Sequence, residues 1–197
     1  MLLEIIAFIL AYLLGSINCA IIICKIGKFS DPRSQGSGNP GASNVLRVAG
    51  KKYAILTLIG DALKGTIAVL VAMLLGLHGA QLGLIAFVAV IGHMYPIFFK
   101  FQGGKGVATA LGSILALSPL LALIGLIVWI VLVVISRYSS LGSLVACIVV
   151  ALTSLFIAPA YFPGLVAIAV FIIWRHRANI RRLKAGTENK LASSGKK

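Results

Sequence analysis

Residues 120–136 read LLALIGLIVWIVLVVIS, an apolar stretch without a charged side chain. A helix of this length rises about 25 Å, close to the ~30 Å hydrocarbon core of a bilayer. Similar apolar runs, separated by polar or glycine-rich segments, lie near residues 2–24, 53–76, 81–99, 106–117, 143–157 and 161–174. They predict a compact bundle of about seven transmembrane helices. Two of these runs, 106–117 and 161–174, are short. The alternative is that they form half-helices within the protein, which would leave five membrane-spanning helices.

The composition supports this assignment. The 197-residue chain is 60% apolar and 11% charged, whereas soluble domains have roughly 45–50% apolar and 25% charged residues. We therefore predict an all-α integral membrane protein, with residues 1–197 as a single membrane domain. The first apolar run lacks the basic start and small-residue cleavage site of a signal peptide, so it should be a retained helix. The three cysteines lack paired spacing and are predicted to be packing residues.

The net charge of +14 is distributed unevenly along the chain. Lys and Arg collect in short cytoplasmic loops of membrane proteins. Here they lie in residues 25–52, 100–105, at Arg137 and in residues 175–197, whereas the intervening turns carry none. This pattern predicts an N-terminus outside, a C-terminus in the cytoplasm and a cytoplasmic glycine-rich loop over 25–52. Residues 190–197 are expected to be a flexible polar tail.

The first polar cluster is GSGNPGASN at residues 36–44, followed by Arg47. Glycine lets the backbone approach an anion closely, and successive N–H groups beside an arginine form a phosphate-sized nest. The alternative is a flexible connector with helix-capping Asn and Ser. The candidate phosphate-binding residues are Gly36, Ser37, Gly38, Asn39, Gly41, Ser43, Asn44 and Arg47.

The second cluster, GGKGVAT at residues 103–109, leads directly into an apolar run. A glycine turn with a lysine at a helix N-terminus offers phosphate oxygens N–H donors, the positive helix end and a point charge. It is not a Walker A motif, because Gly106 follows Lys105 where that motif requires Ser or Thr. A turn with a snorkelling lysine is the alternative. The candidates are Gly103, Gly104, Lys105, Gly106 and Thr109.

The third cluster, RHRANIRRL at residues 175–183, follows the last apolar run. If this segment is helical, His176 and Asn179 share one face and the basic residues another. The basic face favours an anchor on anionic lipid over an active role. An imidazole, however, can bind phosphate as a cation or carry a proton near neutral pH. Arg175 is a secondary candidate in this cluster.

Other polar residues give weaker candidates. Asp61 and Lys64 lie three residues apart in the second apolar run, which favours a buried ion pair over a catalytic role. His93, near the inner end of its predicted helix, is either a core or a site residue. Minor candidates from the third basic turn are Arg137, Ser140 and Ser143.

The charge pattern assigns all three clusters to the cytoplasmic face, independently of their chemistry. Two phosphate-type loops on one face predict two phosphorylated ligands, and the apolar walls beside them predict that one is a lipid or acyl compound. The four acidic residues of the chain are too scattered for a Mg²⁺ site. We expect no metal, no other cofactor and no nucleic-acid partner.

Together these motifs resemble those of the bacterial acyl-phosphate:glycerol-3-phosphate acyltransferases. The resemblance runs from Gly15 to Glu188, and its first motif, residues 36–47, is the most specific part. The other motifs follow in order at residues 60–65, 92–96, 103–109 and 175–188. Two departures are small: Asn18 stands where the family usually has proline, and Ser43 where threonine is common.

The resemblance implies transfer of a long-chain acyl group from acyl phosphate to the 1-hydroxyl of glycerol 3-phosphate, giving lysophosphatidate and phosphate. It places this reaction at the inner face of the bacterial cytoplasmic membrane, within a bundle of seven helices surrounded by lipid. The resemblance implies that Ser37 and Arg47 are essential and that the glycines with Lys105 bind phosphate. It also implies that His176 and Asn179 contribute to activity and that Glu188 has a structural role.

Acyl phosphate is a mixed anhydride with a good leaving group, so such a site mainly aligns two anions and stabilises charge. The proton acceptor is either His176 or a phosphate oxygen of the substrate, which we favour, with Ser37 positioning the donor instead of forming an acyl-enzyme. The alternative function is an organophosphate transporter or channel. It predicts polar residues along a path to the outer face, where the sequence has few.

Overall fold

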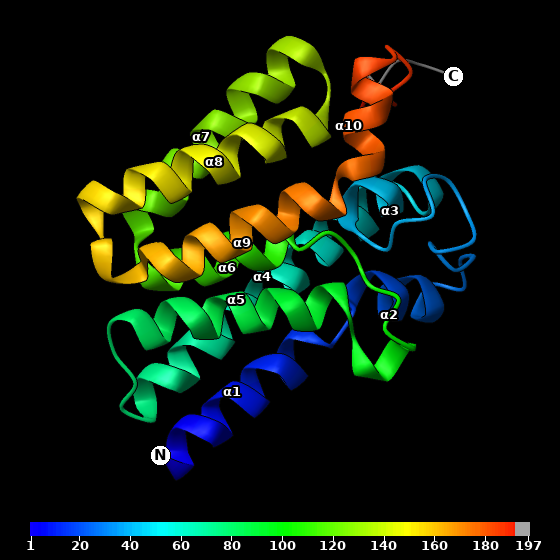
Figure 1. Cartoon of the computed structure of the whole chain (residues 1–197). Helices are drawn as coiled ribbons and strands as arrows, with labels where there is room; N and C mark the ends of the chain where they lie inside the picture. Colours follow the sequence, from blue (N-terminus) through cyan, green and yellow to red (C-terminus); the bar gives the residue numbers. More distant parts are fainter. Residues whose placement is uncertain (192–197) are drawn as a thin grey trace.

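The computed structural model describes residues 1–191, which form helices, turns and loops without a β-strand (Figure 1). Residues 192–197 of the predicted polar tail lie outside the described part of the chain. The α-helices are α1 (Leu2–Gly15), α2 (Cys19–Ile26), α3 (Ala42–Val48), α4 (Lys51–Leu74), α5 (Ala80–Met94), α6 (Val107–Leu117), α7 (Pro119–Ser136), α8 (Ser139–Ile157), α9 (Phe162–Arg175) and α10 (Arg177–Lys184). Two 3₁₀ turns, η1 (Ile97–Phe99) and η2 (Pro159–Tyr161), precede α6 and α9.

Each predicted apolar run corresponds to a helix or to a bent pair of helices. Among the described residues, four segments are long and apolar enough to cross a membrane: α4, α5 with η1, α7 and α8. The bent pairs α1–α2 and α9–α10 raise the number to six if each pair is one span. The short run in the middle of the chain is α6, an apolar helix of 11 residues. The prediction of an all-helical membrane protein is confirmed, and the orientation of the termini remains a prediction.

Two segments differ from their predicted form. The segment 25–52 contains the helix α3, which starts after Gly41 because that residue's carbonyl accepts hydrogen bonds from the N–H groups of Asn44 and Val45. The chain also does not continue as one helix through the third cluster. It bends by 58° at His176, which ends α9 and precedes α10.

The helices approach one another closely where glycines face a neighbouring backbone. Gly65 of α4 lies against the Thr109 carbonyl of α6, and Gly112 of α6 lies against Ala62 of α4. The Thr66 hydroxyl also donates to the Gly112 carbonyl at 2.8 Å. Such small-residue contacts are the usual means of helix association in lipid, where apolar side chains gain little by leaving the bilayer.

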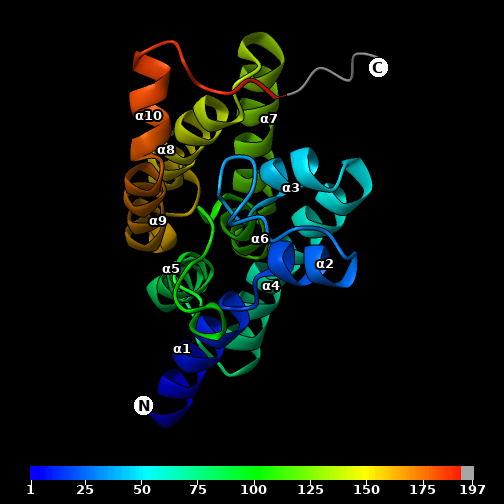
Figure 2. The same cartoon turned by 90° about the vertical axis from the view of Figure 1, so that its right-hand side faces the viewer.

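This packing gathers the polar connections at one end of the bundle. In Figure 1 the α2–α3 connection, the α5–α6 connection and α10 lie at one end, whereas the α4–α5 and α8–α9 turns lie at the other. Figure 2 shows the first two connections beside each other near the start of α6. Segments far apart in sequence are therefore brought to one place.

We predict that Gly112→Ala destabilises the bundle by about 1–3 kcal/mol, because the added methyl would collide with the backbone of α4 at Ala62. Thermal unfolding in detergent measures the change. Val134→Ile is the control, since this side chain is 72% exposed on the outer surface of α7 and should accept the extra carbon without cost. Equal melting temperatures for Gly112→Ala and the parent would contradict the close contact.

Candidate active site

A cavity of about 240 Å³ opens between the first polar loop and helices α6, α7, α8 and α9. One end is polar and includes cationic side chains, among them Arg47, Lys105 and Arg182. The other end is apolar and is lined by Leu121, Ala122, Val150, Leu165 and Ile168. The cavity therefore offers an anion site continuous with an apolar compartment.

The first polar loop is held in shape by the buried side chain of Asn44. Its amide oxygen accepts from the Ser37 N–H at 2.8 Å, and its amide nitrogen donates to the carbonyls of Pro32 and Gln35 at 2.8 and 2.9 Å. Gly36 has a φ of 61°, and a Cβ there would collide with the Asn44 amide. Asn44 thus fixes the backbone on which the exposed Ser37 side chain is presented to the cavity.

The second loop is held through its carbonyl oxygens. The Arg175 guanidinium donates to the carbonyls of Gly103 and Gly104 at 3.0 to 3.2 Å. Gly106, with a φ of 85°, directly precedes α6, as the sequence predicts. Because the carbonyls face Arg175, the Lys105 side chain and the start of α6 are left to face the cavity.

Lys105 joins a hydrogen-bonded network at the polar end. Its ammonium donates to the Asn179 amide oxygen at 2.6 Å, and the Asn179 nitrogen donates to Glu188 at 2.6 Å. Glu188 also accepts from the Ser140 hydroxyl at 2.8 Å and from Arg182 at 2.7 Å. The network connects α10 and the segment after it to α8 and to the glycine loop.

The electrostatic environment changes the acidity of two groups in this network. Burial, assisted by nearby arginines, lowers the pKa of the Lys105 ammonium to about 8, although the Glu188 carboxylate opposes the shift. Burial raises the pKa of Glu188, but hydrogen bonds from Asn179, Ser140 and Arg182 outweigh it and bring the pKa below its ordinary value of 4.5. At neutral pH both side chains are charged.

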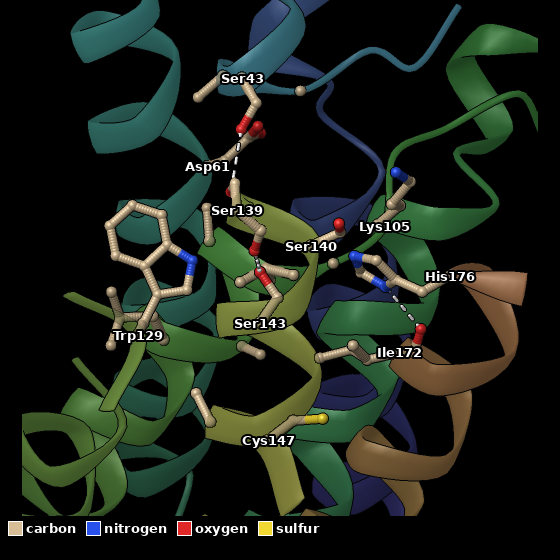
Figure 3. Close-up of a pocket in the computed structure, with 18 of the residues that line it drawn as sticks. Ser43, Asp61, Lys105, Trp129, Ser139, Ser140, Ser143, Cys147, Ile172 and His176 are labelled. Atoms are coloured by element: carbon tan, nitrogen blue, oxygen red, sulfur yellow. Dashed lines mark hydrogen bonds between the residues drawn. The ribbon is translucent and has the colours of Figure 1, made fainter. Parts of the chain in front are cut away.

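His176 lies at the bend between α9 and α10 and is buried. Its Nδ1 is 2.8 Å from the Ile172 carbonyl oxygen, drawn as a dashed line in Figure 3. A carbonyl oxygen only accepts, so Nδ1 carries the hydrogen and Nε2 of the neutral ring is an acceptor. In Figure 3 the ring lies in the same pocket that Ser140 and Ser143 line.

The structure brings most of the sequence-predicted candidates to this one cavity. Its lining includes Ser37, Asn39, Gly41, Ser43, Asn44, Arg47, Asp61, His93, Lys105, Gly106, Ser140, Ser143, His176, Asn179 and Glu188. Outside the lining are Gly36, Gly38, Lys64, Gly103, Gly104, Thr109, Arg137 and Arg175.

Several candidates, most of them outside the lining, have clear structural functions. Asp61 and Lys64 form the predicted buried ion pair, with 2.8 Å between carboxylate and ammonium. Thr109 is fully buried at the α4 contact. Arg137 ends α7 in a left-handed conformation, and its carbonyl accepts from the Leu191 N–H.

Some residues of the lining are absent from the sequence-based candidates, among them Trp129, Ser139 and Arg182. The Ser139 hydroxyl lies 3.5 Å from that of Ser43, and Figure 3 places Trp129 beside this pair. Arg182 belongs to the basic cluster of the sequence, and only its ion pair with Glu188 distinguishes it from its neighbours. Among the described residues, no group of three or more His, Cys, Asp or Glu side chains is placed to hold a metal.

Comparison with known proteins identifies the family. A family model described as Glycerol-3-phosphate acyltransferase matches residues 5–186. A glycerol-3-phosphate acyltransferase of Coxiella burnetii is 47% identical over 189 residues, covering 95% of this chain and 97% of that protein. The chain belongs to the glycerol-3-phosphate acyltransferase family. The resemblance stated from its motifs is confirmed.

Solved structures of this acyltransferase family have the same fold. The crystal structure of PlsY (YgiH), an integral membrane glycerol 3-phosphate acyltransferase in its glycerol 3-phosphate form, matches with a TM-score of 0.91 and 42% identity, covering 96% of each chain. Its lysophosphatidic acid form matches with a TM-score of 0.88 at 42% identity, covering 95% of this chain and 94% of that one.

We predict that Glu188→Gln destabilises this acyltransferase fold by about 1–3 kcal/mol at pH 7, because it weakens charge-assisted hydrogen bonds to a buried carboxylate. A carboxyl group whose pKa is lower in the folded than in the unfolded state stabilises the folded protein at pH values above the unfolded-state pKa. This stabilisation is lost as the pH falls through the folded-state pKa. The stability of the parent should therefore begin to fall toward that of the variant below about pH 4.5 and reach it below the lowered pKa of the folded state. Melting temperatures between pH 3.5 and 7 measure this.

Glu4→Gln provides the matched control for that series. Glu4 is partly exposed near the N-terminus, away from the cavity, and accepts a hydrogen bond from Gln81. Its substitution should leave the melting temperature almost unchanged. A Glu188→Gln deficit of equal size at pH 4 and pH 7 would contradict the role of the Glu188 charge.

Proposed function

We propose that this chain transfers a long-chain acyl group from acyl phosphate to the 1-hydroxyl of glycerol 3-phosphate, forming lysophosphatidate and inorganic phosphate. Its family membership supports glycerol-3-phosphate acylation. The forms in which the related PlsY has been solved, with glycerol 3-phosphate and with lysophosphatidic acid, support the identities of acceptor and product. The acyl-phosphate donor is suggested by the motif resemblance.

The observation that carries the proposal is the two-ended cavity. A phosphorylated acceptor and an acyl chain need an anion site adjoining an apolar compartment, within reach of one reaction centre. The polar end supplies Lys105, Arg47 and the Ser37 hydroxyl. The apolar end, between α6, α7, α8 and α9, suits a hydrocarbon chain that enters from lipid.

The reaction proceeds by direct transfer. The 1-hydroxyl oxygen of glycerol 3-phosphate attacks the acyl carbonyl carbon, a new C–O ester bond forms, and the bond from that carbon to the phosphate oxygen breaks. The leaving phosphate takes the electron pair. Cationic and N–H groups at the start of α6 stabilise the charge that develops on phosphate, so the protein needs no covalent nucleophile.

The hydroxyl proton passes to a phosphate oxygen of the substrate. His176 supports this step through Nε2, which accepts a hydrogen bond from a substrate hydroxyl because Nδ1 is engaged with Ile172. His176 as the proton acceptor itself is the competing assignment. Ser37 positions the donor phosphate, and Arg47 adds positive charge at the same end of the cavity.

We also propose that the cavity opens to the cytoplasm in the inner membrane of a bacterium, with the N-terminus outside. The basic segments gather at the end of the bundle that holds the polar loops, and the turns at the opposite end lack Lys and Arg. Positive loops remain on the cytoplasmic side. Fluorescent or protease tags at each terminus in intact cells test this orientation.

The deciding experiment measures phosphate release by the purified protein in lipid, with palmitoyl phosphate and glycerol 3-phosphate supplied together or singly. We expect release only with both substrates, lysophosphatidate as the second product, and no use of palmitoyl-CoA. Lys105→Met should lower kcat/KM by about 10- to 100-fold, the value of a charge-assisted hydrogen bond. A folded protein that binds glycerol 3-phosphate without turnover, and moves it into vesicles, would favour the transporter alternative.

A second prediction concerns pH. Since the Lys105 pKa is about 8, its ammonium is charged below that value and neutral above it. The kcat/KM for glycerol 3-phosphate should therefore fall about tenfold per unit at pH values well above 8. Lys105→Arg keeps its charge throughout this range, so its pH profile should lose the decline even if its absolute rate is lower. The same decline in the arginine variant would contradict the assignment to Lys105.

A further inference from the structure

A buried cluster of charged residues lies where the first membrane segment is broken. Helix α1 ends at Gly15, α2 starts at Cys19, and the two are bent by 41°. The Lys64 ammonium donates to the Ile17 carbonyl at 2.5 Å, and Asp61 accepts from the Cys19 N–H at 3.4 Å. The Asp61–Lys64 pair thus satisfies one backbone group within the break and one at the start of α2.

His93 connects this pair to the glycine loop. Its Nδ1 lies 2.9 Å from the Lys64 nitrogen and 3.6 Å from the Asp61 carboxylate. Since the Lys64 ammonium only donates, Nδ1 is the acceptor and Nε2 carries the hydrogen. All three residues are almost completely buried, at 1% exposed for Asp61, 4% for Lys64 and 3% for His93.

The other side of His93 touches Gly104 at two points. The His93 carbonyl accepts from the Gly104 N–H at 3.2 Å, and a Cβ on Gly104 would collide with Nε2 of the imidazole ring. The same Cβ would approach the Pro40 carbonyl of the first polar loop to 3.0 Å. His93, Gly104 and Pro40 therefore meet where the two polar loops touch.

We propose that Asp61, Lys64 and His93 are positioning residues that fix the glycine loop and thereby aim Lys105 at the substrate phosphate. This inference rests on the proposed function. Asp61 and His93 line the cavity, whereas Lys64 lies outside its lining. Contacts within the cluster and with the helix break engage the ammonium of Lys64, one carboxylate oxygen of Asp61 and Nδ1 of His93, so these atoms serve the packing of the cluster. The cluster acts on the reaction through Gly104, whose chain neighbour is Lys105.

The charge of the cluster requires a reason beyond stability. Replacing a buried ion pair by apolar groups is often neutral or stabilising, whereas removing one partner leaves an uncompensated charge. Ionisable residues within membrane segments are correspondingly rare and are associated with function. A rigid, directional link between a helix break and a catalytic loop is such a function, because apolar contacts would not fix the loop's orientation.

A double-mutant cycle between His93→Ala and Lys105→Met tests the proposal. Calorimetric binding of glycerol 3-phosphate and steady-state KM and kcat are measured for both single variants and the double variant. We expect each single change to weaken binding about 10-fold or more, and the double variant to be no weaker than Lys105→Met alone. His78→Ala, an exposed histidine in the α4–α5 turn, should bind like the parent. Additive losses would overturn the positioning role.

A second comparison separates positioning from folding. Lys64→Met should lower both melting temperature and glycerol 3-phosphate affinity, whereas Asp61→Asn with Lys64→Met removes both charges and should recover the melting temperature without recovering affinity. Recovery of both together would show that the cluster only stabilises the fold, and would overturn the proposal. A parent that neither binds nor acylates glycerol 3-phosphate would overturn the proposed function as well, whereas additive losses in an active parent would refute this inference alone.

Discussion

Backbone polar groups inside a bilayer have no water to bond, so non-helical chain is stable there only where the protein itself satisfies those groups. The break between α1 and α2 meets that condition through specific side chains, and the two polar loops at one end of the bundle are also held by side chains. Lys64 and Asp61 form hydrogen bonds with backbone groups at the break between α1 and α2. Asn44 holds the first polar loop, and Arg175 holds the carbonyls of the glycine loop. The site is built from these segments, and its geometry depends on those side chains.

The direction of these contacts determines the chemistry of the site. Arg175 binds carbonyl oxygens of the glycine loop from the side away from the cavity, so the negative ends of those peptides are engaged by protein. Asn44, which itself lines the cavity, binds the carbonyls of Pro32 and Gln35 in the first loop. The groups left facing the cavity include the Ser37 hydroxyl, Lys105, Arg47 and the positive end of α6, and the Glu188 carboxylate there is engaged by Arg182 and Asn179. A cavity of this polarity favours anions, although none of the side chains that arrange it needs to touch the anion.

The sequence predicted where the helices lie better than where they break, and the reason is physical. Apolar runs report burial or lipid exposure, and each of them became a helix or a bent pair. The bend at residues 16–18 has a local contribution from Asn18, whose side chain caps α2, and a distant one from Lys64 and Asp61, which no local pattern records. The Asp61–Lys64 pair was predictable from its i, i+3 spacing, but the addition of His93 depends on the packing of α4 against α5. Arg182 was indistinguishable from other basic residues until the fold placed Glu188 beside it.

The charge balance at the polar end links structure to substrate choice. Lys105 and Arg182 would repel each other in the empty cavity, and Glu188 offsets part of this repulsion through Arg182 and Asn179. The offset is incomplete, since burial and the remaining cations hold the pKa of Lys105 near 8. A phosphate dianion entering the cavity supplies the missing negative charge and favours the protonated lysine. A neutral acceptor such as free glycerol would bring no negative charge to Lys105. Under the proposed reaction, this difference in charge selects the phosphorylated acceptor, independently of any hydrogen bonds to its hydroxyl groups.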